Sequence, residues 1–253
     1  MVGPTSPAGE QSIVSVSGSV AKMIRRTLTR TRNRLFLIKR YPKRDEFFSQ
    51  YGQDMFIVEQ LFRGMRGGFF VDIGASDGIT LSNTYYLERN LGWTGICFEP
   101  NPAAYEKLRQ NRKCLCINGA VSNQKGQGRL LRIDGYSEML SGLLDKYDPM
   151  HLVRIEKELR EHGGKREEIM VRCYDLNEVL ADNGVTHVDY LSIDTEGSEF
   201  DILKSVDFEQ ATYKTISVED NYGDDRIEKH LKAKRFKLVA IIGTDEIYVR
   251  RPP

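Results

Sequence analysis

Two acidic residues and two glycines lie close together in the segment 71–78, with the spacing Asp-x-Gly-x-x-x-Gly. Asp72 lies near the end of an apolar run, and Gly74 and Gly78 permit the positive φ and close backbone approach that a ligand on a strand-turn-helix corner needs. A dinucleotide site uses Gly-x-Gly-x-x-Gly against a pyrophosphate. Carboxylates at Asp72 and Asp77 would repel a pyrophosphate and attract a cation. The pattern favours a cationic ligand such as S-adenosylmethionine (SAM) over NAD, with a purely structural corner as the alternative.

A third acidic residue, Glu99, ends the next apolar segment about twenty residues after the glycine turn. A carboxylate in this place can accept hydrogen bonds from both ribose hydroxyls of a nucleoside. Two independent local signals therefore agree on a nucleoside ligand. The segment 118–122, which follows the third expected strand, supplies small and polar groups suited to an adenine edge. The residues predicted to contact the adenosine half are Glu99, Pro100, Asn101, Ala120 and Val121.

A cluster of carboxylates follows two later strands. Asp194 comes directly after the apolar run 188–193, Glu196 follows two residues later, and Glu219 follows the run 215–218. The carboxyl ends of parallel strands form the crevice in which open α/β sheets bind ligands. We therefore predict that Asp194, Glu196 or Glu219 accepts a proton from the substrate. The structural alternative is that Ser198 and Glu199 in this segment only cap and balance the N-terminus of the next helix.

The same cluster offers oxygen ligands for a metal ion. Asp194, Glu219 and Asp220, with the amide of Asn221 beside them, form a set that suits Mg²⁺, a hard cation. Such an ion would hold adjacent substrate hydroxyls and lower the pKa of the one that reacts. Direct proton transfer without a metal is the rival prediction, and the sequence leaves both open.

Four segments resemble the FkbM family of methyltransferases: 70–84 (FVDIGASDGITLSNT), 95–102 (GICFEPNP), 120–122 (AVS) and 191–200 (LSIDTEGSEF). The segment 49–54 (SQYGQD) is similar to one found ahead of the domain in a branch of that family. The resemblance implies a class I methyltransferase fold, SAM as cofactor, and O-methylation of a hydroxyl, often on a sugar or polyketide. It implies SAM contacts by Asp72, Gly74, Gly78 and Glu99, and contacts to the methionine end of SAM by Gln53 and Asn83. The other residues predicted to bind the cofactor are Ala75, Asp77 and Asp194.

The elements that must position these residues alternate along the chain. Apolar runs predict strands at 69–73, 94–98, 114–117, 188–193 and 215–218, with helices between them. This rhythm predicts a Rossmann-like three-layer α/β sandwich with a mostly parallel seven-stranded sheet. The runs 237–242 and 246–250 predict a closing antiparallel hairpin.

Residues 122–172 interrupt this rhythm, which resumes with the run 169–173. We predict that the interruption is a substrate-facing insertion, because specificity elements of α/β enzymes often lie in such segments. Its candidates for contact with the acceptor are Tyr136, Ser137 and Met139.

Charge divides the chain into two parts. Residues 1–44 hold ten Lys and Arg against one acid, Glu10, whereas residues 45–253 hold 27 bases and 35 acids. We predict a disordered, basic extension at 1–44 ahead of the catalytic domain at 45–253. Its basic stretch is interpreted as a solvated extension or as a peripheral contact with an anionic membrane. The acidic body argues against nucleic acid as a partner.

The four cysteines fall in expected strands, which favours buried, reduced thiols and a cytoplasmic location. The four histidines adjoin none of the motifs and are interpreted as structural or solvated. Two rivals to a methyltransferase acting on a small-molecule or glycan hydroxyl are considered. One is an NAD-linked oxidoreductase or epimerase, which the spacing of the glycine turn opposes. The other is a non-catalytic Rossmann-like binding module.

Overall fold

The computed structural model describes residues 35–41, 44–147, 149–220, 223 and 225–252. From Lys39 onward the described residues form one compact unit. Residues 1–34, 42 and 43 lie outside the described residues, so the character of the extension 1–44 stays a prediction. Among the helices that the structure describes, none is long and apolar enough to cross a bilayer.

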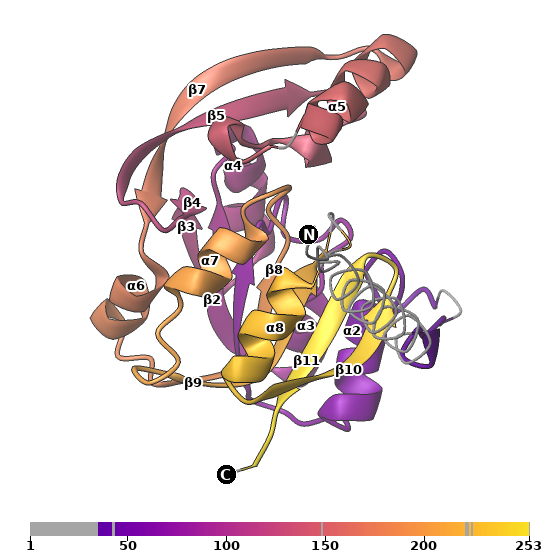
Figure 1. Cartoon of the computed structure of the whole chain (residues 1–253), viewed down its shortest axis with the longest axis vertical. Coiled ribbons are helices and arrows are strands. Elements are labelled where there is room, and N and C mark those ends of the chain that lie inside the picture. Colours follow the sequence, from indigo (N-terminus) through magenta and orange to yellow (C-terminus); the bar gives the residue numbers. More distant parts are fainter. Residues whose placement is uncertain (1–34, 42–43, 148, 221–222, 224, 253) are drawn as a thin grey trace, which may run out of the picture. The chain divides into compact units, whose positions relative to one another are not determined.

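A seven-stranded sheet with the order β10-β11-β9-β8-β1-β2-β3 forms the centre of this unit (Figure 1). Neighbouring strands are parallel except at β11, which runs antiparallel to both β9 and β10. The prediction of a mostly parallel seven-stranded sheet with a closing antiparallel hairpin is therefore confirmed. The strands are β1 (Phe69–Ile73), β2 (Thr94–Glu99), β3 (Leu115–Asn118), β8 (His187–Ile193), β9 (Thr212–Glu219), β10 (Phe236–Ile242) and β11 (Asp245–Arg250).

Helices cover the sheet, because its central strands are apolar on both sides. Every residue of β8 after His187 is buried, as are the last four residues of β1. In Figure 1, α7 and α8 lie in front of the sheet and α3 lies behind it. The helices are α2 (Gln53–Phe56), α3 (Tyr85–Leu91), α4 (Pro102–Asn111), α6 (Leu176–Asp182), α7 (Glu199–Ser205) and α8 (Arg226–Ala233). This arrangement is the three-layer sandwich expected for a parallel sheet.

Apolar residues recur near helical spacing over 53–66, which predicts one leading helix over that range, but α2 ends at Phe56. After α2 the chain continues as a π-helix, η1 (Ile57–Leu61), in which the Phe62 amide donates to the Ile57 carbonyl. Arg63 and Gly64 then adopt positive φ values of 50° and 74°. This left-handed turn ends the helix, although apolar residues continue beyond it.

The insertion forms a second sheet with the order β4-β7-β5-β6. Its long strands pair antiparallel from Gly126 with Cys173 to Asp134 with Lys165. The run 169–173 belongs to this sheet, so its interpretation as the point where the main alternation resumes is wrong. The elements are β4 (Ala120–Val121), β5 (Gly126–Asp134), η2 (Glu138–Leu140), β6 (Gly142–Leu143), η3 (Leu144–Lys146), α5 (Pro149–His162) and β7 (Lys165–Tyr174).

Helix α5 packs onto the second sheet through an apolar cluster. Ile155 on the helix joins Leu131 and Ile133 of β5 and Leu140 of η2 in that cluster. The helix is thereby fixed above the main sheet, as the upper part of Figure 1 shows.

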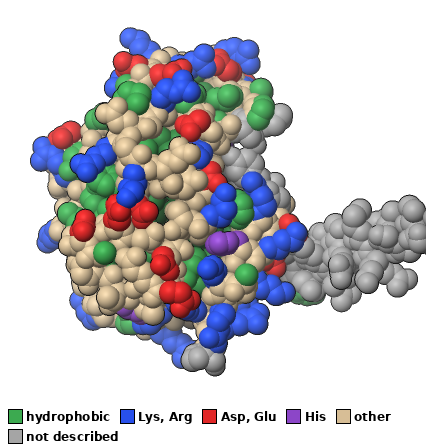
Figure 2. Space-filling view, turned by 60° about the vertical axis from the view of Figure 1, so that its left-hand side comes forward, with side chains coloured by type: hydrophobic (Ala, Val, Ile, Leu, Met, Phe, Trp, Pro, Cys, Tyr) green, Lys and Arg blue, Asp and Glu red, His purple; other side chains and the backbone are tan. Residues whose placement is uncertain are grey.

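Charged side chains of both signs are mixed on the surface. On the face shown in Figure 2, Lys and Arg side chains are interspersed with Asp and Glu. Mixed charge of this kind gives no extended positive field for a phosphate backbone. The expectation that nucleic acid is not a partner stays a prediction.

Candidate functional site

A cavity of about 310 Å³ lies at the carboxyl ends of the main strands. This size is within the range of ligand pockets, and the position is where open α/β sheets bind their ligands. Most of the predicted site residues line it: Gln53, Asp72, Gly74, Ala75, Asn83, Glu99, Pro100, Asn101, Ala120, Val121, Asp194, Glu196 and Glu219.

The glycine turn between β1 and α3 shapes one wall of the cavity. Gly74 has a φ of 90°, and a Cβ there would overlap the backbone carbonyl of Asp194. Gly78 and Asp77 do not line the cavity. Gly78 has a φ of 83° and packs against Leu108 and Arg112, while Asp77 accepts hydrogen bonds from the Ile79 and Thr80 amides at 2.9 and 2.7 Å. These two residues hold the turn in place, and their predicted contacts with the cofactor stay a prediction.

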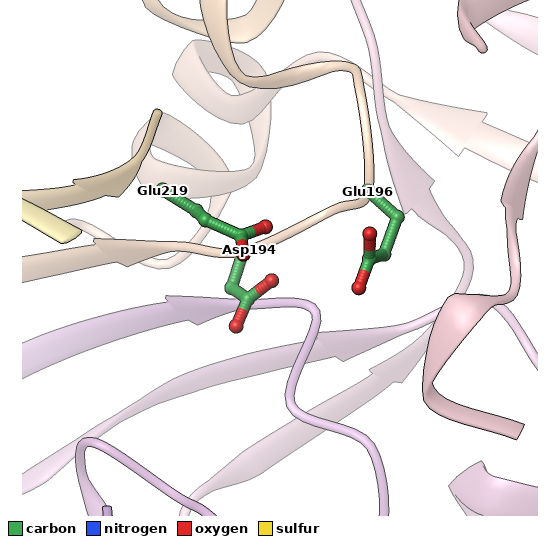
Figure 3. Close-up of side chains that lie close together, drawn as sticks. All are labelled: Asp194, Glu196 and Glu219. Carbon is green, nitrogen blue, oxygen red and sulfur yellow. The ribbon is translucent and has the colours of Figure 1, made fainter. Parts of the chain in front are cut away.

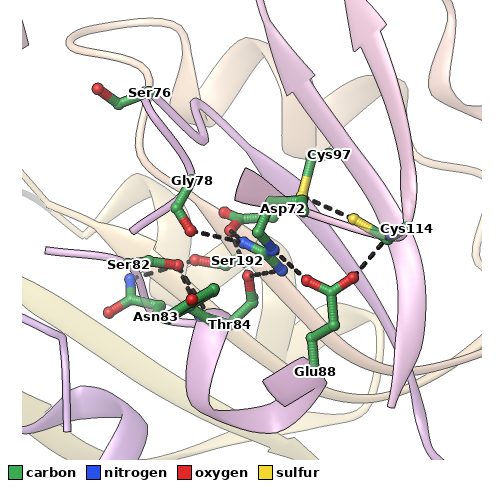
Figure 4. Close-up of polar contacts among 12 residues, drawn as sticks. Asp72, Ser76, Gly78, Ser82, Asn83, Thr84, Glu88, Cys97, Cys114 and Ser192 are labelled. Carbon is green, nitrogen blue, oxygen red and sulfur yellow. Dashed lines mark hydrogen bonds and ion pairs between the residues drawn. The ribbon is translucent and has the colours of Figure 1, made fainter. Parts of the chain in front are cut away.

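Asp72 lines the cavity, but its charge is balanced inside the protein. Its Oδ2 accepts a hydrogen bond from Thr84 Oγ1 at 2.5 Å and lies 4.0 Å from Arg112 Nη1. Arg112 is itself buried and also contacts Glu88. Figure 4 shows Asp72, Thr84 and Glu88 within this network of polar contacts. Burial raises the pKa of Asp72, and Arg112 lowers it. The attraction for a cationic ligand that the sequence assigns to Asp72 is therefore largely cancelled by Arg112.

Glu99 links the end of β2 to the glycine turn. Its Oε2 accepts from the Ser76 amide at 2.8 Å and its Oε1 from the Asn101 amide at 2.7 Å. Burial raises the pKa of Glu99 to about 7. Asn101 caps α4 through the Ala103 amide at 3.1 Å. The carboxylate is thus fixed at the cavity wall, as a contact to ribose hydroxyls requires.

The other end of the cavity carries amide and carboxyl groups from distant segments. Gln53 Nε2 donates to Asp245 Oδ2, and Asn83 Nδ2 donates to Ser192 Oγ at 3.2 Å. Asn83 Oδ1 is buried and accepts no hydrogen bond from the described residues. Burial raises the pKa of Asp245 to about 7.

The sequence prediction missed Asp245 and Ser192, both of which line the cavity. Asp245 pairs with Glu219 in the register of β9 and β11. Its position beside the fifth strand could have been inferred from the expected closing hairpin. Ser192 lies inside a buried strand, where its type carries no signal of function.

Three carboxylates meet where β8 and β9 end. Asp194, Glu196 and Glu219 can each direct one oxygen so that all lie within 4.8 Å of one another (Figure 3). The predicted metal set is changed at one position, because Asp220 does not line the cavity and accepts a hydrogen bond from the Gly223 amide at 2.9 Å. Asn221 lies outside the described residues.

Burial and mutual repulsion favour the protonated forms of these carboxyl groups. Burial and the neighbouring Glu219 raise the pKa of Asp194 well above its usual value. The same two causes raise the pKa of Glu196 to about 8. Such a group can accept a proton near neutral pH, and a bound cation would stabilise the ionised forms.

The backbone around Glu196 adopts a conformation that few side chains take. Glu196 has a φ of 55° and Gly197 a φ of 124°. The Glu199 carboxylate accepts from the amides of Thr195 and Gly197 at 3.0 and 2.9 Å. Glu199 therefore holds the loop that directs Glu196 into the cavity, which is more than a balance of the helix terminus.

The insertion forms the remaining wall of the cavity. Of its three predicted acceptor contacts, Met139 lines the cavity, whereas Tyr136 is exposed and Ser137 is buried outside it. Arg154 of α5 is the only basic residue among the lining residues in the described part of the chain.

His151 lies against the acid cluster, although no motif adjoins it in the sequence. Its Nε2 is 3.4 Å from Glu196 Oε2. The other histidines contact different groups: His162 lies near Glu158, His187 near Asp189, and His230 near the Leu203 carbonyl. The contact joins segments more than forty residues apart, so local sequence patterns could not have revealed it.

Comparison with known proteins identifies relatives for most of this domain. The family described as "Methyltransferase FkbM domain" matches residues 72–238, more than half of the chain. "Methyltransferase 1" of Beauveria bassiana is 27% identical over 150 residues, which cover 56% of this chain and 59% of that protein. "Methyltransferase sdnD" of Sordaria araneosa is 29% identical over 164 residues, which cover 56% of this chain and 61% of that protein. The chain thus spans about three fifths of the length of these relatives.

Two solved structures show a distant likeness. A methyltransferase FkbM from Methylobacillus flagellatus aligns with 76% of this chain and 47% of its own at 9% identity, with a TM-score of 0.43. A TehB-like SAM-dependent methyltransferase from Corynebacterium glutamicum aligns with 80% of this chain and 89% of its own at 10% identity, with a TM-score of 0.39.

Proposed function

The chain belongs to the FkbM methyltransferase family, and we propose that it transfers the methyl group of SAM to a hydroxyl oxygen of a sugar, a glycan or a related small molecule. The observation that carries this proposal is the convergence of buried carboxyl groups on one cavity at the carboxyl ends of the strands. A bound cation stabilises the ionised forms of these groups, and their negative charge then suits a ligand with a sulfonium and an ammonium group. It opposes a pyrophosphate and hence NAD.

The residues at the cavity fit SAM in their chemistry. Glu99 would accept hydrogen bonds from the ribose hydroxyls, and Ala120 and Val121 would lie along the adenine. The buried Asn83 Oδ1 offers an acceptor to an ammonium group, with Asp245 and Gln53 beside it. When bound, SAM supplies a methyl group that is already activated by its sulfonium. The protein's own task is therefore to orient the acceptor and remove its proton.

We assign proton removal to Glu196. Its carboxyl group lines the cavity, and burial raises its pKa to about 8, close to the pH at which a general base works best. Asp194 and Glu219 stand beside it and would stabilise positive charge on the cofactor side. Orientation of two bound reactants contributes about 7–11 kcal/mol in favourable cases, and the general base about 10²–10⁴-fold.

A metal-assisted version of the same reaction is the second candidate, supported by the three oxygens of Asp194, Glu196 and Glu219 within 4.8 Å. These carboxylates would hold Mg²⁺, whose chemistry is to lower the pKa of a hydroxyl bound to it. The protein's own residues would orient the acceptor both in the metal-assisted reaction and in direct proton transfer.

Two measurements test the proposal. Calorimetry should show that SAM binds and NAD does not; binding of NAD alone would indicate an oxidoreductase, and binding of neither would indicate a non-catalytic module. A screen of SAM consumption over glycans and hydroxylated small molecules, with and without a chelator, should then find turnover. Loss of turnover on adding the chelator would establish the metal-assisted version, and unchanged turnover would establish direct proton transfer.

A further inference from the structure

The backbone conformation of Glu196 needs support from both sides of the cavity. A non-glycine residue with positive φ costs on the order of 1–3 kcal/mol and persists only where its surroundings enforce it. Glu199 supplies one support, through the amides of Thr195 and Gly197 at 3.0 and 2.9 Å. These contacts fix the backbone of the loop and involve no atom of the Glu196 side chain.

Helix α5 of the insertion supplies the second support. His151 is in the first turn of α5, is 9% exposed, and brings its Nε2 to 3.4 Å from Glu196 Oε2. The Tyr147 ring stacks on the imidazole with centroids 4.8 Å apart and an interplanar angle of 22°. Tyr147 Oη in turn donates to the Leu140 carbonyl at 2.6 Å. The imidazole is therefore held in one plane by the same segment that lines the acceptor side of the cavity.

His151 does not itself line the cavity, whereas Glu196 does. A group in this place does not contact the reactants and acts through the carboxylate it faces. We propose that His151 is a positioning residue, which fixes the rotamer of the Glu196 carboxylate. Correct catalytic geometry then depends on the position of α5 against the main sheet. This inference rests on the proposed function, because it concerns the group that accepts the acceptor's proton.

The physical reason is the distance dependence of catalysis. A displacement of a reacting group by about 1 Å can lower a rate by about 10²-fold. Loss of His151 removes the α5 side chain that lies 3.4 Å from the Glu196 carboxylate, while the proposed SAM contacts on β1 and β2 stay in place. The effect should therefore fall on kcat and leave SAM binding unchanged.

The test compares His151→Ala and His151→Asn with His162→Ala as the matched control. His162 is on the same helix, half-exposed and away from the cavity. We expect His151→Ala to lower kcat by about 10- to 100-fold with the dissociation constant for SAM within twofold of wild type. His151→Asn, which keeps a polar amide side chain beside Glu196, should recover at least fivefold of that loss. His162→Ala should match wild type.

A double variant separates positioning from general damage to the fold. If His151 acts through Glu196, adding His151→Ala to Glu196→Gln should lower kcat by less than twofold further. A kcat for His151→Ala within twofold of wild type, or multiplicative losses in the double variant, would overturn the inference. Thermal unfolding and SAM calorimetry on each variant identify any that fail to fold, and His151→Asn then carries the comparison.

The contact has a readout that needs no turnover. In histidine-selective ¹⁵N NMR, Glu196→Gln should shift one imidazole signal of the full chain, and His151→Asn should remove that same signal. Absence of turnover in the wild-type protein would contradict the proposed function alone. An imidazole spectrum unaffected by Glu196→Gln would contradict the His151 inference, whatever the turnover.

Discussion

The carboxyl groups that line this cavity differ in their surroundings, and for that reason we assign them different roles. Asp72 is balanced by Arg112, Glu99 accepts two backbone amides, and Glu196 lies among other acids. Three side chains with the same carboxyl group thus lie in three different electrostatic environments. The first two predictions test this division.

Glu99→Gln should weaken SAM binding about tenfold or more. The substitution puts an amide nitrogen where an oxygen now accepts from Ser76 or Asn101, and it removes the charge that strengthens hydrogen bonds to ribose. Glu106→Gln on α4 makes the same change of charge at an exposed position and should leave affinity within twofold. Calorimetry with SAM measures both, and equal affinities for the two variants would show that Glu99 does not contact the cofactor.

Glu196 should control the pH dependence of turnover. A base must be ionised to act, and burial raises the pKa of Glu196 to about 8, so kcat/KM should rise with pH and level off above about pH 8. Glu196→Gln should lower the plateau about 10²–10⁴-fold and flatten the profile. Initial rates from pH 6 to 9 provide the measurement. A wild-type profile that is flat over this range would assign the proton to another group.

Sequence reasoning found the residues that directly follow the strands, because a strand end fixes its neighbour at the sheet edge. It placed Glu99, Asp194 and Glu219 at the cavity for this reason. His151 was beyond its reach, since it meets the acid cluster only through a contact with a segment far away in the chain. Asp245 was missed, although the expected hairpin places it beside the fifth strand.

At the scale of elements, the backbone geometry of the turn between β1 and α3 determines the shape of one wall of the cavity. Gly74 brings β1 and the loop after β8 so close together that no side chain fits between them. The apolar runs predicted the strands themselves, since burial on both faces leaves a clear signal. They did not predict that 169–173 joins a second sheet. The residue pattern along a strand does not identify the neighbouring strand with which it pairs.

Gly74→Ala should destabilise the protein far more than Gly184→Ala. Both positions have positive φ, 90° and 66°, and so share a backbone cost of about 1–2 kcal/mol for an L-residue. A Cβ at Gly184 meets nothing within 4 Å, whereas one at Gly74 overlaps the Asp194 carbonyl and forces β1 and β8 apart. Thermal unfolding of the two variants makes the comparison. Equal midpoints would mean that the loop after β8 yields easily, and SAM affinity should then be retained as well.

At the scale of the whole molecule, acidic side chains are buried in and around the cavity. Their ionisation opposes folding. Burial raises the pKa of Glu99 and Asp245 to about 7 and that of Glu196 to about 8. Asp54, Asp72 and Glu199 are shifted upward by the same cause. A chain that keeps such a cluster gains a site for a cation at the expense of stability.

The unliganded protein should therefore lose stability as pH rises. An acid whose pKa is raised on folding holds its proton in the folded state at pH values where the unfolded chain has released it. Its stabilising contribution is complete below the unfolded pKa of about 4 and disappears as pH rises through the folded value. Each such group lowers the free energy of unfolding by about 1.4 kcal/mol per pH unit within that window. His230, whose pKa burial lowers, acts in the opposite direction near pH 6.5, but it is one group against several.

Urea unfolding at pH 5, 6, 7 and 8 measures this dependence, and the expected fall between pH 5 and pH 8 is on the order of several kcal/mol. Because a cation stabilises the ionised cluster, SAM should raise the midpoint more at pH 8 than at pH 6. Glu196→Gln removes one of the titrating groups, so its curve should be shallower than that of wild type, whereas Glu106→Gln on the exposed face of α4 should leave the slope unchanged. Stability that is constant or rises over this pH range would show that the carboxyl groups are ionised in the folded protein at little cost, and it would contradict the raised pKa values of Glu99, Glu196 and Asp245.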